Sequence, residues 1–279
     1  SQVFCSNGSD EALALSFLAF FNQGSRILFP DITYSFYPVY ARLFDIDYEA
    51  VPLDAEFKID INKYMKANGG IVFPNPNAPT GIFMPVSELE KLAEYNLNQA
   101  VVIVDEAYIA FGGESAVRLI EKYPNLLIVR TMSKSHSMAG LRVGYCLGNQ
   151  SLIEGLNRIK NSFNSYVVDR CAMAAAAAGL ADETYYAGIA RKIMGTRERV
   201  GESLIRMGFK VLPSAANFIF ASPPGGDARG LYEFLRLNGV LVRYFEGERV
   251  NKFIRVTIGT DEQMDEFLRI TCLLYTSDA

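Results

Sequence analysis

Short, continuous runs of apolar residues recur along the first half of the chain, and each ends in a polar segment. The clearest are residues 101–104 (VVIV) and 126–129 (LLIV), with shorter runs at 26–30 and 71–73. Runs of this length that are rich in β-branched residues are typical of strands buried on both faces of a parallel sheet. We therefore predict an α/β fold with a mostly parallel central sheet flanked by helices.

Helical segments are expected between these runs. Residues 8–21 (GSDEALALSFLAFF) begin with a turn, and the two acidic residues that follow favour a first helical turn. Another helix is expected after Pro85, where Ser87 and Glu90 have the spacing of a capping box. Both segments continue with enough apolar residues to bury one side against the sheet.

The second half of the chain changes its pattern. Residues 151–163 and a long stretch after a break at 164–166 are helical, and short strands then alternate with short helices. The later segments are FKVLP, NFIFAS, LYEFLRLNG, VLVRYF and KFIRVTIG. This change predicts a large domain at 1–183 and a smaller α+β domain at 184–272.

Both ends depart from the pattern of a complete domain. The first residues enter an apolar segment without an initiator methionine, so we expect the chain to begin inside a domain. The helical pattern of residues 261–270 gives way to TCLLYTSDA, which does not continue its periodicity. We therefore expect residues 273–279 to be a non-native tail.

Composition narrows the class of protein. The 279 residues are 50% hydrophobic and 21% charged, which is ordinary for a globular protein with a sizeable core. A net charge of −4 without a basic block argues against a nucleic-acid partner, and no apolar run approaches the ~20 residues of a membrane span. Four dispersed cysteines and a single histidine predict neither a metal site nor a disulfide framework, so a cytoplasmic location is expected.

A lysine and an arginine follow the run at 126–129. Lys134 comes directly after Ser133, and Arg142 lies in a glycine-punctuated piece just beyond. In open α/β sheets, ligands bind at the carboxyl ends of the strands. An amine that can form an imine, beside groups that bind phosphate, is what pyridoxal phosphate requires. Taken alone, these residues fit a solvated surface loop equally well.

An acidic residue ends the run at 101–104. Asp105 follows this strand directly, and Tyr108 lies three residues beyond. A carboxylate there costs free energy unless a cation or a strong donor pairs with it. A protonated pyridine nitrogen is such a partner, and the pairing would preserve the electron-sink character of the cofactor. The alternative is an exposed aspartate at a strand end.

Three weaker signals precede these segments. Tyr34 lies where a strand becomes a helix and could stack on a planar ring, whereas Tyr37 and Tyr40 are expected to be packing residues. The closely spaced prolines of the loop 75–81 (NPNAPTG) prevent both a helix and the hydrogen bonding of a β-sheet. Its asparagines are therefore held in an irregular loop and are candidates for ligand contacts. Backbone amides near Ser9 either bind phosphate or simply begin a helix.

Three basic residues stay open to two interpretations. Arg243 and Arg255 each follow strand residues. Each either packs its aliphatic part on the protein with the guanidinium in solvent, or binds an anion through two guanidinium nitrogens. The pattern alone favours the surface interpretation. His136 lies two residues after Lys134, but the lysine can serve as both base and acid, so no catalytic histidine is needed.

The order of these segments carries more weight than any one of them. Along the chain they are GSDE, TYSFY, NPNAPTG, DEAY, SK, GLR, VRYF and IRVTIG. This order resembles the fold-type I pyridoxal-phosphate aminotransferases of class I/II, and most closely the histidinol-phosphate aminotransferase family. The resemblance covers residues 1–270 and is most specific in DEAY, SK and GLRVGY.

The resemblance implies a role for each matching residue. Lys134 would form the imine with the cofactor and move the proton between the substrate Cα and the cofactor. Arg255 would bind the carboxylate in the glutamate half-reaction, and Arg243 would help to bind the phosphate of the substrate. The implied cofactor-binding residues are Ser9, Asp10, Tyr34, Asn77, Asp105, Tyr108, Ser133, Lys134 and Arg142.

The resemblance also implies a reaction and its context. L-Histidinol phosphate would donate an amino group to 2-oxoglutarate in histidine biosynthesis, in a homodimeric enzyme. An aromatic aminotransferase or a threonine-phosphate decarboxylase shares these motifs. From a different class, a catalytically inactive fold-type I module remains open, such as the sensor half of a transcription regulator or an inactive fragment.

Three departures from the family pattern matter. Ala78 stands where the family often has asparagine, which leaves the ring-hydroxyl contact to Asn77 or to Tyr108 alone. Val167 stands where proline is expected. We also expect the sequence to begin after the N-terminal segment that, in the family, supplies part of the small domain and a tyrosine to the partner's cofactor site.

Overall fold

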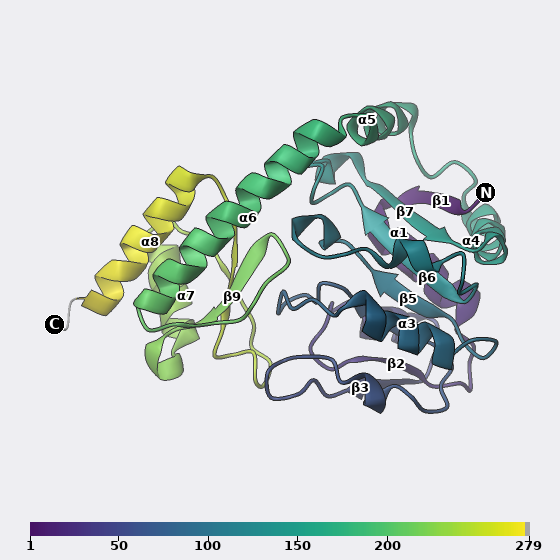
Figure 1. Cartoon of the computed structure of the whole chain (residues 1–279), viewed down its shortest axis with the longest axis horizontal. Coiled ribbons are helices and arrows are strands. Elements are labelled where there is room, and N and C mark those ends of the chain that lie inside the picture. Colours follow the sequence, from purple (N-terminus) through teal and green to yellow (C-terminus); the bar gives the residue numbers. More distant parts are fainter. Residues whose placement is uncertain (277–279) are drawn as a thin grey trace.

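Two β-sheets organise the computed structural model, which describes residues 1–276 (Figure 1). The larger sheet has seven strands in the order β1-β7-β6-β5-β4-β2-β3, and only β7 runs antiparallel to its neighbours. Its strands are β1 (Val3–Asn7), β2 (Ile27–Pro30), β3 (Tyr48–Val51), β4 (Ile71–Pro74), β5 (Val102–Asp105), β6 (Leu126–Thr131) and β7 (Val143–Gly148). The predicted mostly parallel sheet is confirmed.

Strand residues alternate between two cores, because successive side chains of a strand point to opposite faces. Ile103 and Leu127 pack with helices α1 (Gly8–Phe20), α2 (Tyr37–Leu43) and α4 (Gln150–Phe163). Val102 and Val104 pack on the other face with α3 (Val86–Tyr95) and the 3₁₀ segments η1 (Ile61–Lys63) and η3 (Ala116–Leu119). Both faces are therefore covered, as the continuous apolar runs indicate.

The smaller sheet is antiparallel, in the order β10-β11-β9-β8. Its strands are β8 (Lys210–Val211), β9 (Phe218–Ser222), β10 (Arg243–Tyr244) and β11 (Ile254–Thr257). Helices α6 (Glu183–Arg206), α7 (Ala228–Leu237) and α8 (Asp261–Thr276) cover one face around Leu204, Leu231 and Phe267. The predicted α+β unit is present.

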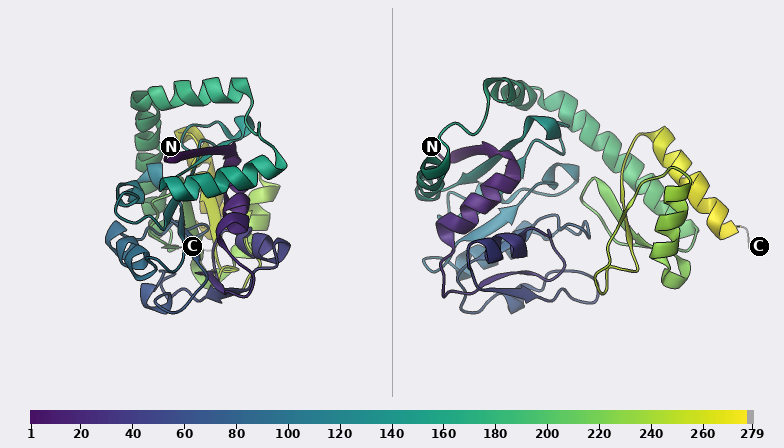
Figure 2. Two further views of the ribbon diagram at one scale, coloured as in Figure 1. Left: turned by 90° about the vertical axis from the view of Figure 1, so that its right-hand side faces the viewer. Right: turned by 180° about the vertical axis from the view of Figure 1, so that it is seen from behind.

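Helix α6 joins the two sheets. It begins beside α5 (Arg170–Ala181) near the large sheet and runs diagonally to the small one (Figures 1 and 2). Midway along it, Arg197 donates through Nη1 to the carbonyl of Phe111, in η2 (Ile109–Phe111), at 2.7 Å, and to the carbonyl of Ala216 at 2.8 Å. One guanidinium therefore fixes the loop after β5 to the loop before β9.

A second contact lies at the other side of the boundary between the sheets. Arg249 donates to the carbonyls of Leu53 and Asp54 and lies 3.5 Å from the carboxylate of Asp31. An apolar cluster that includes Phe57 and Phe253 fills the space beside it. The boundary is thus packed and hydrogen-bonded.

Two local expectations are wrong. Helix α1 begins at Gly8 rather than after a turn. The capping box before α3 does not form, because Glu90 instead accepts hydrogen bonds from Lys122 and Tyr123. Helix α8 continues through Thr276, and residues 277–279 lie outside the described residues; that residues 273–279 are a non-native tail stays a prediction.

Within residues 1–276, no helix combines the length and the apolar character that crossing a membrane requires.

Candidate active site

A cavity of about 150 Å³ lies at the carboxyl ends of β4, β5 and β6. Its position is the one expected for ligand sites in open α/β sheets. It is lined by Ser9, Asp10, Tyr34, Pro74, Ala78, Asp105, Ala107, Tyr108, Thr131, Ser133, Lys134, Ala139 and Arg142. Of the predicted site residues, all but Asn77, Arg243 and Arg255 therefore line one cavity.

Asp105 is the buried acid of this cavity, with 6% of its surface exposed. Its Oδ1 accepts a hydrogen bond from the Ala107 amide at 3.0 Å, and its Oδ2 accepts one from the Tyr37 hydroxyl at 3.3 Å. Burial raises its pKa to about 6, although the two hydrogen bonds oppose the shift. Among the described residues, no cation forms an ion pair with it.

Lys134 is the amine of the cavity. Burial is the main cause that lowers its pKa, and the nearby charge of Arg255 adds to the effect. Its Nζ lies 5.7 Å from the centroid of the Tyr108 ring, and within residues 1–276 no carboxylate forms an ion pair with it. A lowered pKa increases the fraction of neutral, nucleophilic amine near neutral pH.

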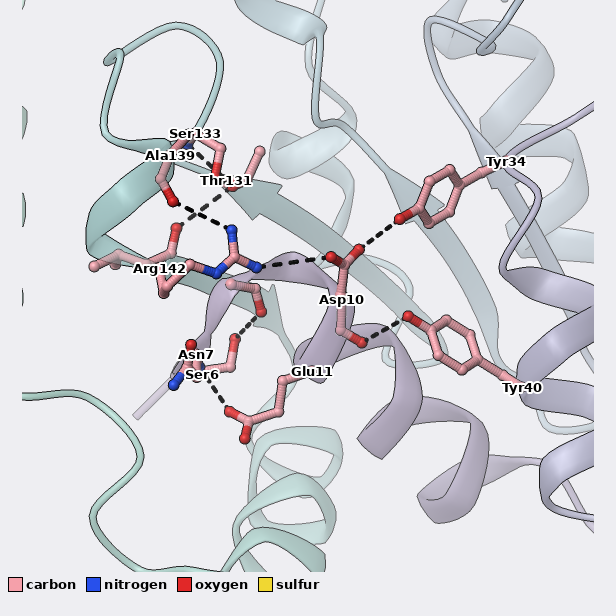
Figure 3. A network of polar contacts seen from close by, with 12 residues as sticks. Ser6, Asn7, Asp10, Glu11, Tyr34, Tyr40, Thr131, Ser133, Ala139 and Arg142 are labelled. Carbon is pink, nitrogen blue, oxygen red and sulfur yellow. Dashed lines mark hydrogen bonds and ion pairs between the residues drawn. The ribbon is translucent and has the colours of Figure 1, made fainter.

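The first turn of α1 faces Arg142 at one end of the cavity (Figure 3). Arg142 Nη2 lies 3.7 Å from Asp10 Oδ2, and Nη1 donates to the carbonyl of Ala139 at 3.3 Å. Thr131 donates to the Ser133 hydroxyl at 3.0 Å on the same side. Unpaired amides of a first helical turn, a guanidinium and hydroxyls together suit an anionic group such as phosphate.

Glycine allows the start of α1 to lie close to β7 and to Arg142. A Cβ on Gly144 would collide with the backbone of Gly8 and Ser9, and a Cβ on Gly8 would collide with the guanidinium of Arg142. Gly8 also has a φ of 81°, which favours glycine. The close approach of α1 to β7 and Arg142 at this end of the cavity thus depends on two positions without side chains.

Two tyrosine hydroxyls contact Asp10 in the first turn of α1 (Figure 3). Tyr34 donates to Asp10 Oδ1 at 2.7 Å, and Tyr40 donates to the Asp10 carbonyl at 3.1 Å. Tyr37 and Tyr40 do pack in the core as expected, but their hydrogen bonds to site residues were missed. The three-residue spacing of Tyr37 and Tyr40, which places both on one side of α2, is the signal that could have indicated them.

Arg243 and Arg255 lie on neighbouring strands, directly opposite each other in the β10–β11 pair. The Arg255 guanidinium lies 5.0 Å from the centroid of the Phe218 ring, which contacts Tyr108 edge-on. Burial lowers the pKa of Arg255, and its buried Nε has no hydrogen-bond partner in the described structure. Two adjacent cations, neither with an ion-pair partner among residues 1–276, suit an acidic ligand.

Asn77 does not line the cavity. Its Nδ2 donates to the carbonyl of Ile32 at 3.0 Å and to the Thr80 hydroxyl at 3.1 Å, and it borders a separate space of about 110 Å³. Ala78 lines the cavity in its place. Cis peptide bonds before Pro76 and Pro79 accompany this arrangement of the loop.

His136 also stays outside the cavity lining. Its Nδ1 lies 3.0 Å from the Ser135 hydroxyl, and its ring lies 4.5 Å from that of Tyr186. The ring therefore packs against α6 rather than facing the other site residues.

Residues 1–270 match the aminotransferase class I and II family. The chain belongs to this family. It is 52% identical over 265 residues to the histidinol-phosphate aminotransferase of Clostridium beijerinckii, covering 95% of this chain and 74% of that protein. It is 53% identical over 261 residues to that of Pseudomonas putida, covering 94% and 75%. The predicted family and its transferase class are confirmed.

Solved aminotransferase structures share the fold. A putative histidinol-phosphate aminotransferase from Erwinia carotovora superimposes with a TM-score of 0.91 at 22% identity, covering 99% of this chain and 82% of that chain. The Sinorhizobium meliloti enzyme, solved in complex with pyridoxal-5′-phosphate, has a TM-score of 0.89 at 22% identity, covering 100% and 78%. The predicted fold type is therefore confirmed.

Proposed function

We propose that the cavity binds pyridoxal 5′-phosphate and that the chain transfers the amino group of L-histidinol phosphate to 2-oxoglutarate. Relatives that are about half identical carry the name histidinol-phosphate aminotransferase, and one structural neighbour was solved with this cofactor. One observation carries the proposal: Lys134 and the buried Asp105 line the same cavity, and neither has an ion-pair partner among the described residues.

The residues of the cavity fit the parts of this cofactor. Arg142, Ser133 and the first-turn amides of α1 would bind the phosphate. Asp105 would face the ring nitrogen, and the pairing would offset the cost of burying its charge. Stacking of Tyr34 on the ring and a hydrogen bond from Tyr108 to the ring hydroxyl complete the proposed contacts.

The bound cofactor supplies an electron sink for charge that develops at the substrate Cα. Lys134 Nζ removes the proton from Cα and returns one during the reaction, and its lowered pKa favours the neutral amine that this requires. An ionised Asp105 would pair with the ring nitrogen of the cofactor and would favour its protonated form.

The small sheet would supply the substrate specificity. Arg255 would bind the carboxylate of glutamate or 2-oxoglutarate, and Arg243 would help to bind the phosphate group of histidinol phosphate. Their support is their position: both guanidinium groups lie at the Phe245 ring, at 5.7 and 5.6 Å from its centroid. We accordingly assign cofactor binding to residues 1–183 and this specificity to residues 184–272.

A homodimer is part of the proposal, and cytoplasmic histidine biosynthesis is the corresponding cellular role. Light scattering coupled to size-exclusion chromatography tests the dimer directly. A protein that stays monomeric with cofactor bound would contradict that part.

Cofactor binding and substrate choice need separate experiments. Adding pyridoxal phosphate should give a visible absorbance band of covalently bound cofactor, and Lys134→Ala should lack it. Histidinol phosphate, phenylalanine and threonine phosphate should then be compared as amino donors. Cofactor binding without conversion of any amine would support an inactive module, and a preference for phenylalanine or decarboxylation of threonine phosphate would identify one of the related activities.

A further inference from the structure

The carboxylate of Asp105 is held by donors from two different elements. The Ala107 amide, in the loop just after β5, binds Oδ1 at 3.0 Å. The Tyr37 hydroxyl, at the start of α2, binds Oδ2 at 3.3 Å. Because each oxygen has its own donor, rotation of the carboxylate about its Cβ–Cγ bond would break both hydrogen bonds.

Tyr37 is itself immobile. Its side chain is fully buried, and it packs against Phe17, Phe29 and Tyr34 with ring centroids 6.2, 6.0 and 5.7 Å away. A ring packed on three sides cannot change its rotamer without disturbing the core. The position of the Tyr37 hydroxyl is therefore set before any ligand binds.

The other two tyrosines of this segment cannot replace it. Tyr34 donates to Asp10 Oδ1, and Tyr40 donates to the backbone carbonyl of Asp10. Among the described residues, Tyr37 is thus the only side chain that donates to Asp105.

We propose that Tyr37 is a positioning residue of the aminotransferase reaction, because its hydroxyl fixes the orientation of the Asp105 carboxylate toward the cofactor ring. This inference rests on the proposed function. Tyr37 does not line the cavity, so it acts through Asp105 and touches neither cofactor nor substrate.

The electrostatic surroundings of Asp105 allow this hydrogen bond to be measured. Burial raises the Asp105 pKa, whereas the Ala107 and Tyr37 hydrogen bonds lower it, so loss of the hydroxyl should raise the pKa further. The other titratable or charged groups that interact with Asp105 from the elements packed around it are Asp10, Tyr34, Tyr40, Tyr108, Lys134 and Cys146, and Arg142 lines the same cavity. All of them remain in a Tyr37→Phe variant.

Tyr37→Phe removes only the hydroxyl oxygen and should retain the ring packing. In the cofactor-free protein, NMR titration with carboxyl-labelled aspartate should show the Asp105 pKa above its wild-type value. With cofactor and substrate, we expect kcat to fall about tenfold, which is the loss of one hydrogen bond to a charged group, with little change in KM.

Tyr64→Phe is the matched control. Tyr64 is also fully buried in the large domain, but its hydroxyl has no hydrogen-bond partner in the described structure. This variant should leave both the Asp105 titration and kcat unchanged. Equal effects from the two substitutions would assign the loss to packing and overturn the proposal.

Two further outcomes decide the proposal. An Asp105 titration that is the same in Tyr37→Phe and wild type would overturn it, as would a kcat within twofold of wild type. If Tyr37→Phe does not fold, the Asp105→Asn variant gives a second measurement, in which the ring resonances of Tyr37 but not of Tyr64 should move. A wild-type chain without transferase activity would refute the proposed function, and the titration would still decide the hydrogen bond.

Discussion

Two neighbouring buried carboxylates, Asp105 and Glu106, lie at the end of strand β5, and only Glu106 forms an ion pair among the described residues. Glu106 accepts hydrogen bonds from the Ser115 hydroxyl at 2.7 Å, the Ala116 amide at 2.7 Å and Arg130 Nε at 3.0 Å. It also forms an ion pair with Arg130 at 2.9 Å. Asp105, one residue earlier, has two neutral donors and no ion pair among the described residues.

The difference separates a structural carboxylate from one that is available to a ligand. Successive residues of a strand point to opposite sides, so the pair Asp105–Glu106 serves two environments. The side chain of Glu106 is wholly buried and its charge is compensated within the protein. Asp105 and Lys134 keep incomplete pairing in one cavity, which is the usual condition of groups that bind or react.

Lys134→Ala should have the largest effect of all. Removing the amine should reduce amino transfer by about 10³-fold or more, because the proton acceptor and the covalent attachment are lost together. Steady-state assays measure this loss. The unfolding midpoint of the cofactor-free protein should not fall, since Lys134 has no ion pair to break among residues 1–276; a clear destabilisation would show that the amine is structural.

Glu106→Ala should have the opposite effect: it should lower the stability of the folded protein. It leaves Arg130 half-buried without its partner, and breaking such a pair costs about 3–5 kcal/mol. Urea unfolding measures the change. Glu114→Ala, which removes an exposed pair with Arg118, is the control and should change stability by less than about 1 kcal/mol. A similar loss of unfolding free energy in Glu106→Ala and Glu114→Ala would show that the buried ion pair of Glu106 has no special structural role.

Asp105→Asn should stabilise the cofactor-free protein at neutral pH. The folded-state pKa of Asp105, about 6, exceeds its ordinary value of 3.8, so the folded state binds more protons between these pH values. Wild-type stability should therefore fall as pH rises from 4 to 6, by about 3 kcal/mol in total. The variant should lack this component, and unfolding curves across that range test it. An identical pH dependence in both proteins would contradict the raised pKa.

Arg255→Lys should give the smallest change. A lysine keeps the charge but loses the planar two-point contact with a carboxylate, so kcat/KM for glutamate should fall about tenfold. Arg229→Lys, at an exposed position on α7, is the control and should behave like wild type. An unchanged kcat/KM for Arg255→Lys would place the carboxylate contact elsewhere.

Local pattern predicted site residues at or just beyond the ends of strands, because ligands of open α/β sheets bind at the carboxyl ends of the buried strands. Asp105 and Lys134 are of this kind. The contact between Tyr37 and Asp105 spans 68 positions, and no periodicity encodes such a distance. Likewise, the capping-box spacing at Ser87 and Glu90 could not reveal that Lys122 and Tyr123 compete for the glutamate.

Helix α6 makes the cavity sensitive to changes made far from it. Its 24 residues extend about 36 Å, so a tilt of about 5° at one end moves the other by roughly 3 Å. Arg197, near the middle of α6, donates hydrogen bonds to the carbonyls of Phe111 and Ala216 and so connects the helix to both parts of the molecule. Substitutions along α6 would thus shift Arg255 relative to Lys134 and retune substrate preference without altering a single residue of the cavity wall.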